Sequence, residues 1–279
     1  MIDRACISIN NRCNLCCSYC HFRAPGKLPH LAEADMDVHA VLDNITRHVD
    51  KYGITGFKLG FVGNGEPLLD FGALKDYISH IGAYLADGRI CAYTITNGTL
   101  VTAEMLVFFR EHGVSMGLSV DGLPEIHDKY RCGTHGRVMA AAELYREING
   151  HYPSMNCTAG RDVLERADET IAFFEPFGSR VTFSRMIGEG GITQEEFRGF
   201  LGKAEKRLNV RRGGYDCTMY GGLCGAGISN IFYANGRVYL CGNCVDLPAV
   251  SDALAPLDSI APAIPQFDRS RCFRELSGL

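Results

Sequence analysis

Residues 11–22 read NRCNLCCSYCHF and place four cysteines within eight positions near the N-terminus. Three of them follow the spacing C-x3-C-x2-C, namely Cys13, Cys17 and Cys20. Three thiolates on one tight loop can bind three corners of a cubane iron–sulfur cluster and leave the fourth iron open for a ligand. Zinc is the alternative, because Cys16 or His21 is close enough in the sequence to supply a fourth ligand.

The composition is that of a globular protein with a sizeable core. Its 279 residues are 46% hydrophobic and 22% charged, enough for one large α/β domain or a domain with an appendage. The net charge of −4 argues against general binding to nucleic acid or to an anionic membrane. No stretch approaches the roughly 20 apolar residues of a membrane span, and the start, MIDRACISIN, lacks the layout of a secretion signal. We therefore expect a cytoplasmic protein with reduced thiols.

The thirteen cysteines fall largely into two groups. The first is the loop just described, and the second occupies the last quarter of the chain: Cys217, Cys224, Cys241, Cys244 and Cys272. A disulfide scaffold would be typical of a short secreted chain, which this is not. The distribution therefore predicts two metal centres.

Apolar runs and helical patterns alternate along residues 5–184. We expect strands at residues 5–9, 57–63, 90–96, 115–120, 154–159 and 179–184. Helical spacing recurs between them at residues 38–49, 74–85, 105–109, 138–148 and 171–174; Gly53 is a plausible stop of the first helix and Thr102 a plausible cap of the third. Six such alternations predict an α/β fold with a parallel sheet and crossover helices.

Unusual motifs follow the first four expected strands. The cysteine loop follows the first, GNGEPLL (63–69) the second, TNGTL (96–100) the third and SVDG (119–122) the fourth. Carboxyl ends of parallel strands lie on one rim, where such folds bind their ligands. The sequence therefore predicts a single site there, and Asp121 is expected to fix its loop.

The pattern changes after residue 185. Thr193 and Glu196 form a capping box that opens a helix through Leu208, and Cys-rich sequence follows. We place a boundary near residue 210, which gives domains 1–209 and 210–279. Two apolar runs joined by the turn YANG predict a hairpin between Cys224 and Cys241, whose open end brings these two thiols together.

These residues resemble the radical S-adenosylmethionine enzymes. Tyr19 matches the aromatic residue before the last cysteine of the signature, and GNGEP (63–67) resembles the family's glycine-glycine-glutamate-proline motif with Asn64 inserted. The resemblance implies a partial (β/α)6 barrel whose [4Fe–4S] cluster binds S-adenosylmethionine. It further implies that an electron enters the cluster and that a 5′-deoxyadenosyl radical abstracts a hydrogen atom from the substrate.

The motifs TNGTL and SVDGLPEIHDKYR resemble the members of this family that modify peptides and protein side chains. By that resemblance Asn97 lies near the cofactor, Ser119 and Arg131 hold its carboxylate, and the turn with Gly65 and Glu66 contacts its amino group. A carboxylate or a backbone carbonyl suits an ammonium group. Glu66 alternatively braces the turn, and Arg131 alternatively is a surface arginine.

The frame C-x11-G-x4-C from Cys224 through Gly236 to Cys241 resembles the auxiliary-cluster modules called SPASM and twitch domains. The chain has too few further cysteines for two auxiliary clusters, so one auxiliary [4Fe–4S] cluster is expected. Its ligands would be Cys217, Cys224 and Cys241, with Cys272 or Cys244 as the fourth. A structural zinc ion is the alternative.

Peptide-modifying relatives make a ribosomally made peptide the expected substrate, with oxidative cross-linking as the reaction and a flavodoxin- or ferredoxin-type electron donor. The first strand begins at residue 5, so we expect no leader-peptide domain before it. An epimerase would instead use a thiol as hydrogen donor, either Cys157 or Cys132, although Cys157 also fits a buried packing role. A sulfatase-type maturase or a small-molecule dehydrogenase is a further alternative. An iron–sulfur electron carrier would explain the cysteines but not the motifs on the rim.

Overall fold

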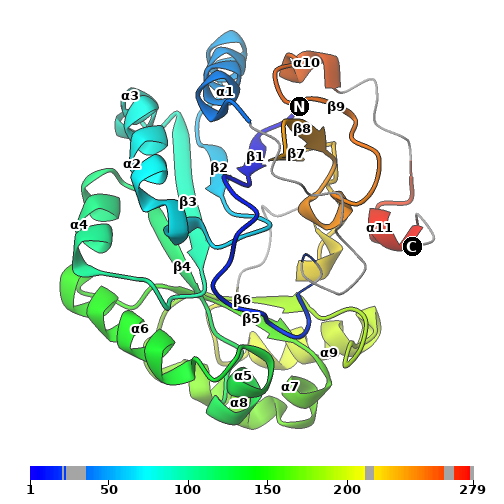
Figure 1. The fold of residues 1–279 in the computed structure, drawn as a ribbon. Coiled ribbons are helices and arrows are strands. Elements are labelled where there is room, and N and C mark those ends of the chain that lie inside the picture. Colours follow the sequence, from blue (N-terminus) through cyan, green and yellow to red (C-terminus); the bar gives the residue numbers. More distant parts are fainter. Residues whose placement is uncertain (21, 23–35, 211–216, 261–266, 277–279) are drawn as a thin grey trace.

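The computed structural model describes residues 1–20, 22, 36–210, 217–260 and 267–276. Its described residues form one sheet with the strand order β6-β5-β4-β3-β2-β1-β7-β8-β9 (Figure 1). The strands are β1 (Arg4–Ile7), β2 (Phe57–Phe61), β3 (Ile90–Thr96), β4 (Ser115–Ser119), β5 (Ser154–Ala159), β6 (Val181–Arg185), β7 (Asn230–Ala234), β8 (Arg237–Tyr239) and β9 (Ser251–Asp252).

Strands β1 to β6 are parallel and pair in sequence order. Their carboxyl ends therefore share one rim of the sheet, as the sequence predicts. The other edge of β1 pairs in parallel with β7, so that Cys6 lies between Gly60 and Phe232. Strands β8 and β9 continue the sheet in antiparallel fashion.

Most of the helices lie along the outer face of the curved sheet (Figure 1). The helices of the described residues are α1 (Val38–Tyr52), α2 (Phe71–His80), α3 (Gly82–Ala86), α4 (Ala103–Glu111), α5 (Pro124–Tyr130), α6 (His135–Asn149), α7 (Arg161–Glu165), α8 (Ala167–Phe174), α9 (Gln194–Ala204), α10 (Leu257–Ile260) and α11 (Phe273–Leu276). Short 3₁₀ turns are η1 (Pro67–Asp70), η2 (Glu175–Phe177), η3 (Thr218–Tyr220) and η4 (Gly242–Cys244). This arrangement confirms the predicted α/β partial barrel.

Side-chain alternation gives the sheet two different faces. The face under the helices is apolar: Phe57, Leu59 and Phe61 of β2 are all fully buried in the main hydrophobic cluster. The opposite face carries smaller or more polar side chains, and a Cβ on Gly117 of β4 would lie 2.6 Å from the Asn156 amide. The helix-covered face thus supplies the core, and the inner face stays available for a site.

Local signals explain where several helices begin and end. The Asp37 side chain accepts a hydrogen bond from the Ala40 N–H at the start of α1, and Gly53 ends that helix with a φ of 60°. Thr102 caps α4 by accepting from Met105, as predicted. The predicted capping box is also present at the start of α9.

Three helical predictions need correction. The helix expected over residues 74–85 is divided at Ile81 into α2 and α3, because Gly82 follows and has a low helix propensity. Helices α5 and α7 were not expected, since they bury too few side chains to leave a periodic pattern. Helix α9 ends at Ala204, before Leu208.

The predicted hairpin is present as β7 and β8. Asn235 and Gly236 have φ angles of 51° and 69°, the left-handed values that a two-residue hairpin turn requires. The parallel pairing of β7 with β1 was not predicted, and it joins the hairpin to the main sheet. The division at 209/210 stays a prediction, and residues 211–216 lie outside the described residues. In the part of the chain that the structure describes, no helix has the length and apolar character needed to span a membrane.

Candidate active site

The cysteine loop after β1 is fastened to the loop after β2. The Asn10 side-chain amide donates to the Glu66 carbonyl at 3.2 Å, and the Glu66 N–H donates to the Arg12 carbonyl at 2.7 Å. Gly65 lies so close that a Cβ there would be 2.2 Å from the Arg12 carbonyl oxygen. Only glycine fits at this position, so the Gly-Glu-Pro turn is required by its packing against the cysteine loop.

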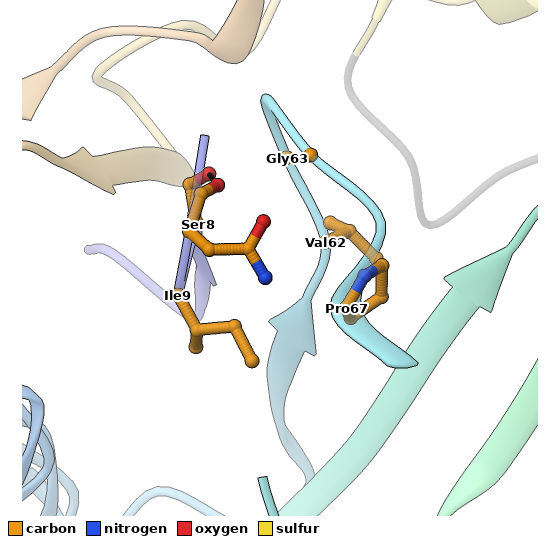
Figure 2. A pocket seen from close by; sticks show the side chains of 7 residues that line it. Ser8, Ile9, Val62, Gly63 and Pro67 are labelled. Atoms are coloured by element: carbon orange, nitrogen blue, oxygen red, sulfur yellow. Dashed lines mark hydrogen bonds between the residues drawn. The ribbon is translucent and has the colours of Figure 1, made fainter. Parts of the chain in front are cut away.

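Figure 2 shows the narrow recess between these two loops, lined by Ser8, Ile9, Val62, Gly63 and Pro67 among others. The Ser8 hydroxyl accepts from the Asn64 N–H at 2.9 Å and donates to the Asn10 carbonyl at 2.9 Å. A Cβ on Gly63 would lie 2.5 Å from Ser8. The two loops therefore hold each other in place here, and the recess is too narrow for a ligand of nucleoside size.

The Glu66 carboxylate joins the loop after β2 to the end of β3. One oxygen accepts from the Thr96 hydroxyl at 2.7 Å and from the Leu68 N–H at 3.1 Å. The other accepts from the Asn97 N–H at 2.8 Å. Burial raises the pKa of Glu66, and these three donors oppose the rise. Both oxygens are thus engaged within the protein, which supports the bracing role of Glu66.

Asn97 connects the end of β3 to the cysteine loop. Its side-chain amide donates to the Asn14 side chain at 2.9 Å and lies 3.9 Å from the Cys13 sulfur. Its side-chain oxygen accepts from the N–H and the hydroxyl of Thr99, at 2.9 and 2.7 Å. Asn97 is therefore oriented from both ends and presents its N–H2 group to the first cysteine of the motif.

The carboxylate of Asp121, just after β4, accepts hydrogen bonds from several segments around the cysteine loop. Its carboxylate accepts from Nε and Nη2 of Arg131, at 2.7 and 3.3 Å, and from the Tyr19 hydroxyl at 2.5 Å. The Thr158 N–H at the end of β5 also donates to it, at 2.9 Å. The Arg131 guanidinium lies 5.3 Å from the centre of the Tyr19 ring. One buried carboxylate thus links the loop after β1 with β4, β5 and the end of α5.

Arg131 is a buried ion-pair partner and not a surface residue, with only 9% of its surface exposed. Burial acts to lower its pKa, but Asp121 more than offsets this effect, so the net shift is upward and the guanidinium stays charged. Asp121 uses Nε and Nη2 and leaves Nη1 for another acceptor. That remaining donor suits the predicted contact with a carboxylate.

His127 is hydrogen-bonded to the backbone on both sides of the Asp121–Arg131 ion pair, directly or through Thr134. Its Nδ1 accepts the Asp121 N–H at 3.3 Å, so the proton of the neutral ring lies on Nε2, 3.1 Å from the Thr134 hydroxyl. The Thr134 hydroxyl in turn donates to the Arg131 carbonyl at 2.7 Å. Burial lowers the pKa of His127 to about 4. A neutral histidine therefore orients both backbone segments that carry the ion pair.

The three motif cysteines are half-buried on their loop. Burial raises the pKa of Cys17 to about 11; Arg131 opposes the rise, and the neighbouring Cys20 and Cys13 thiols add to it. The extra thiol, Cys16, is exposed and lies 3.4 Å from the sulfur of Cys132. Cys16 thus contacts the loop after α5.

The chemistry of this donor set fits an iron–sulfur cluster: three thiols on one loop, next to an amide donor and an arginine. Within the described residues, no three His, Cys, Asp or Glu side chains are close enough together to hold a single metal ion. Thiols around a four-iron cubane are more widely separated than those around one zinc ion. His21, one of the ligands considered for zinc, lies outside the described residues.

The five C-terminal cysteines also come together. Cys224 and Cys241 belong to one small apolar cluster, with Phe267 and Phe273 packed against it. Burial raises the pKa of Cys217, and the nearby Cys241, Cys224 and Cys272 raise it further. The structure therefore brings the hairpin's two flanking thiols together, as predicted, with the other thiols near them.

Cys241 differs from Cys217, Cys224 and Cys244, whose pKa values are raised. The Cys244 thiol donates a hydrogen bond to the Cys241 sulfur, and this donation lowers the Cys241 pKa despite burial. The Asn243 N–H also donates to its sulfur, at 3.5 Å, and the Arg274 charge acts in the same direction. A thiol that ionises readily is suited to metal binding.

Cys157 and Ser119, which both have predicted roles, lie in different surroundings. Cys157 is buried in the main hydrophobic cluster, on the helix-covered face of β5, whereas Asn156 and Thr158 alternate onto the other face. This position favours the packing role of Cys157. Ser119 is the half-buried last residue of β4, two residues before Asp121, and its role stays a prediction.

A family model described as the radical SAM superfamily matches residues 7–203. The chain belongs to the radical SAM superfamily. Membership implies a [4Fe–4S] cluster and S-adenosylmethionine, and the three cysteines, Asn97 and the Asp121–Arg131 pair all lie inside the matched range.

Similar proteins extend this result. The cysteine-type anaerobic sulfatase-maturating enzyme of Clostridium novyi is 23% identical over 60% of this chain and 46% of its own length. The solved structure of anSMEcpe with bound AdoMet and Cp18Cys peptide has a TM-score of 0.71 and 18% identity, over 92% of this chain and 79% of that one. Streptococcus suis SuiB bound to S-adenosylmethionine has a TM-score of 0.71 and 15% identity, over 94% and 64%. The two structures show the shared fold, and this chain spans about half the length of the curated relative.

Sequence reasoning missed parts of the support around the site. Asp121 was expected only to fix its loop, yet it pairs with Arg131 and Tyr19. His127 had no predicted role because an isolated histidine carries no ligand pattern. The spacing of SVDG and HDKYR was the available signal, since a carboxylate and an arginine ten residues apart flank one short helix.

Proposed function

We propose that this protein is a radical S-adenosylmethionine enzyme that oxidises a ribosomally made peptide, forming a cross-link or a related two-electron product. The observation that carries the proposal is the joining of the C-x3-C-x2-C loop to three strand ends. Glu66, Asn97 and Asp121 each form a hydrogen bond with a residue of the cysteine loop: Glu66 with Asn10, Asn97 with Asn14 and Asp121 with Tyr19. Glu66 and Asn97 are also hydrogen-bonded to each other.

The chain's own residues have distinct tasks in this proposal. Cys13, Cys17 and Cys20 would hold the reactive cluster, and Arg131 Nη1 with Ser119 would hold the cofactor carboxylate. Tyr19, Gly65, Glu66 and Asn97 would shape the rest of the pocket. When bound, the cluster and S-adenosylmethionine supply the one-electron chemistry that removes a hydrogen atom from the substrate and yields 5′-deoxyadenosine. The protein orients the reactants and keeps water and stray hydrogen donors away.

The C-terminal thiols support an oxidative outcome. Cys217, Cys224 and Cys241 would hold one auxiliary [4Fe–4S] cluster with Cys272 or Cys244. Such a centre can accept the electron that a substrate radical must lose to give a two-electron product. A flavodoxin- or ferredoxin-type protein would supply the electron that starts each turnover.

The names of similar proteins support a peptide or protein substrate. One relative is a sulfatase-maturating enzyme, and one structure of similar fold contains a bound peptide. A sulfatase-type maturation of a protein side chain is therefore the nearest variant of this proposal.

The test is anaerobic incubation of the reconstituted enzyme with S-adenosylmethionine, dithionite and candidate peptides in D2O. We expect 5′-deoxyadenosine and a peptide lighter by two hydrogen atoms. Cys91→Ala is a matched control, because Cys91 is exposed near the amino end of β3, away from the rim. The absence of 5′-deoxyadenosine under these conditions would leave an electron carrier as the better description.

The second candidate is a peptide epimerase, favoured by the exposed thiol of Cys132 beside Cys16. A thiol can return a hydrogen atom because its S–H bond is weaker than most C–H bonds. In D2O an epimerase would incorporate one deuterium at an α-carbon, and Cys132→Ala would abolish that incorporation. Cys157→Ala tests the buried alternative in the same assay.

A further inference from the structure

A second recess, of about 380 Å³, opens at the carboxyl end of β6. Its walls come from the start of α7, from the segment after β6 and from the C-terminal helix α11. The lining side chains include Arg161, Arg185, Ile187, Ile192, Thr193 and Glu275. None of these residues belongs to the cysteine loop or to the loops that follow β2, β3 and β4, so the recess is separate from the candidate cofactor site.

Arg185 gives this recess its chemistry. Its side chain is 8% exposed, its Nη1 donates to the Ile192 carbonyl at 3.0 Å, and its Nη2 donates to the Glu275 carboxylate. Its Nε–H is buried and has no hydrogen-bond partner among the described residues. A buried donor without a partner is unfavourable, and more so when the group is charged.

Other arginines of this protein show what is missing at Arg185. Nε and Nη2 of Arg131 both donate to one carboxylate, and the same two-point contact occurs at Arg166 with Glu169 and at Arg207 with Glu175. At Arg185 the equivalent edge is only half used, because Glu275 reaches Nη2 alone. The guanidinium therefore retains one donor suited to a carboxylate oxygen.

The rest of the recess fits a carboxylate that is attached to a carbon chain. Ile187 and Ile192 give apolar wall, and the volume exceeds what a small inorganic anion needs. The second arginine, Arg161, donates both Nη groups to Glu196, at 2.7 and 3.2 Å. Glu275 is 41% exposed on a helix of four residues, so it can move aside more easily than buried Arg185.

We propose that this recess binds a carboxylate of the substrate peptide, either an Asp or Glu side chain or the C-terminal carboxylate, through Arg185. The proposal rests on the proposed peptide substrate and adds an anchoring point to it. The recess lies on the same rim as the cofactor loops but at β6, so a peptide held here by an acidic group could extend towards the cysteine loop.

The experiment measures equilibrium binding of three blocked tripeptides to the reconstituted enzyme by calorimetry. Acetyl-Gly-Asp-Gly-amide carries a side-chain carboxylate, acetyl-Gly-Asn-Gly-amide is its neutral match, and acetyl-Gly-Gly-Gly carries only the C-terminal carboxylate. We expect one of the two acidic peptides to bind at least about tenfold more tightly than the neutral one, which identifies the source of the carboxylate. Equal binding of all three would overturn the proposal.

Variants assign the effect to Arg185. Arg185→Gln should remove the preference for the acidic peptide, and Glu275→Gln should strengthen binding several-fold by freeing Nη2. Arg166→Gln is the control, because this arginine already has its carboxylate partners on the surface. If Arg185 only anchors α11, Glu275→Gln will leave acidic-peptide binding unchanged or weaken it, and this result would overturn the proposal. The Glu275→Gln variant therefore tests the proposal even if Arg185→Gln fails to fold. Formation of 5′-deoxyadenosine is measured separately, so failure here differs from failure of the proposed function.

Discussion

At the scale of single residues, the four thiols of the cysteine loop differ in their surroundings. Cys13, Cys17 and Cys20 are half-buried, whereas Cys16 is exposed and lies against Cys132. We predict that replacing any of the first three by alanine abolishes S-adenosylmethionine cleavage, because a cubane that loses one thiolate is rarely held in a productive state. Cys16→Ala should retain cleavage. The measurement is 5′-deoxyadenosine formed per enzyme after anaerobic reconstitution, and full activity of a Cys13, Cys17 or Cys20 variant would contradict the assignment.

His127 predicts a pH dependence of folding stability. Its pKa is lowered from 6.5 to about 4 in the folded protein, mainly by burial, with Asp121 and Asp128 opposing and Arg131 and His135 assisting the shift. Between these two values the unfolded chain binds a proton that the folded chain does not. The stabilisation is therefore complete above pH 6.5 and is lost as the pH falls towards 4, by an amount on the order of 1–3 kcal/mol.

Urea unfolding of the cluster-free chain at several pH values measures this effect. The free energy of unfolding should fall less steeply with decreasing pH in His127→Asn than in the wild type. His151→Asn serves as the control, since His151 is exposed. Identical pH slopes for the wild type and His127→Asn would show that another group titrates.

At the scale of elements, the β7–β8 turn carries a position that depends on backbone conformation. Gly236 has a φ of 69°, and Cys241 follows five residues later. Gly236→Ala should lower the free energy of unfolding by about 1 kcal/mol, because an L side chain is strained at this angle. Gly199→Ala, at an open helical position of α9, should instead be neutral or stabilising by about 0.5–1 kcal/mol. Urea midpoints check both, and equal effects would refute the conformational argument.

The elements also show how far the sequence predicts this structure. Strand β3 matches its predicted range, 90–96, because seven apolar or β-branched residues in a row, followed by the turn residues Asn97 and Gly98, have one natural interpretation. Helix α5 was missed because only Ile126 and His127 are buried in it, so no periodicity is visible. The pairing of β1 with β7 was missed because residues more than 200 positions apart leave no local signal.

The same limit applies to the candidate site. The sequence predicts that four motifs share one rim, since strand direction alone decides this. It does not predict which side chains bond across the loops. Asp121 receives Tyr19, Arg131 and the Thr158 N–H from three different segments, and only the folded chain brings these donors together.

At the scale of the whole molecule, ion pairs attach the C-terminal segment both to the residues after the β7–β8 hairpin and to the end of β6. Arg274 donates to Asp246 and to the Asn243 carbonyl, next to Cys244, while Glu275 pairs with Arg185 at the end of β6. Cys272 precedes both residues in the same short segment. The thiols nearest the C-terminus are thereby held against both the hairpin and the main sheet.

The proposal of two clusters in one chain predicts a definite metal content. Anaerobically reconstituted protein should contain about eight irons, the content of two cubanes, falling to about four when Cys13, Cys17 and Cys20 are replaced together. The matched control replaces Cys6, Cys91 and Cys157 instead, three thiols outside both groups, and should retain about eight. Iron and acid-labile sulfide are measured on the same samples, with zinc alongside. About twelve irons would indicate a further auxiliary centre, and zinc remaining in the triple variant would refute an electron-accepting role for the C-terminal thiols, because zinc has no redox chemistry.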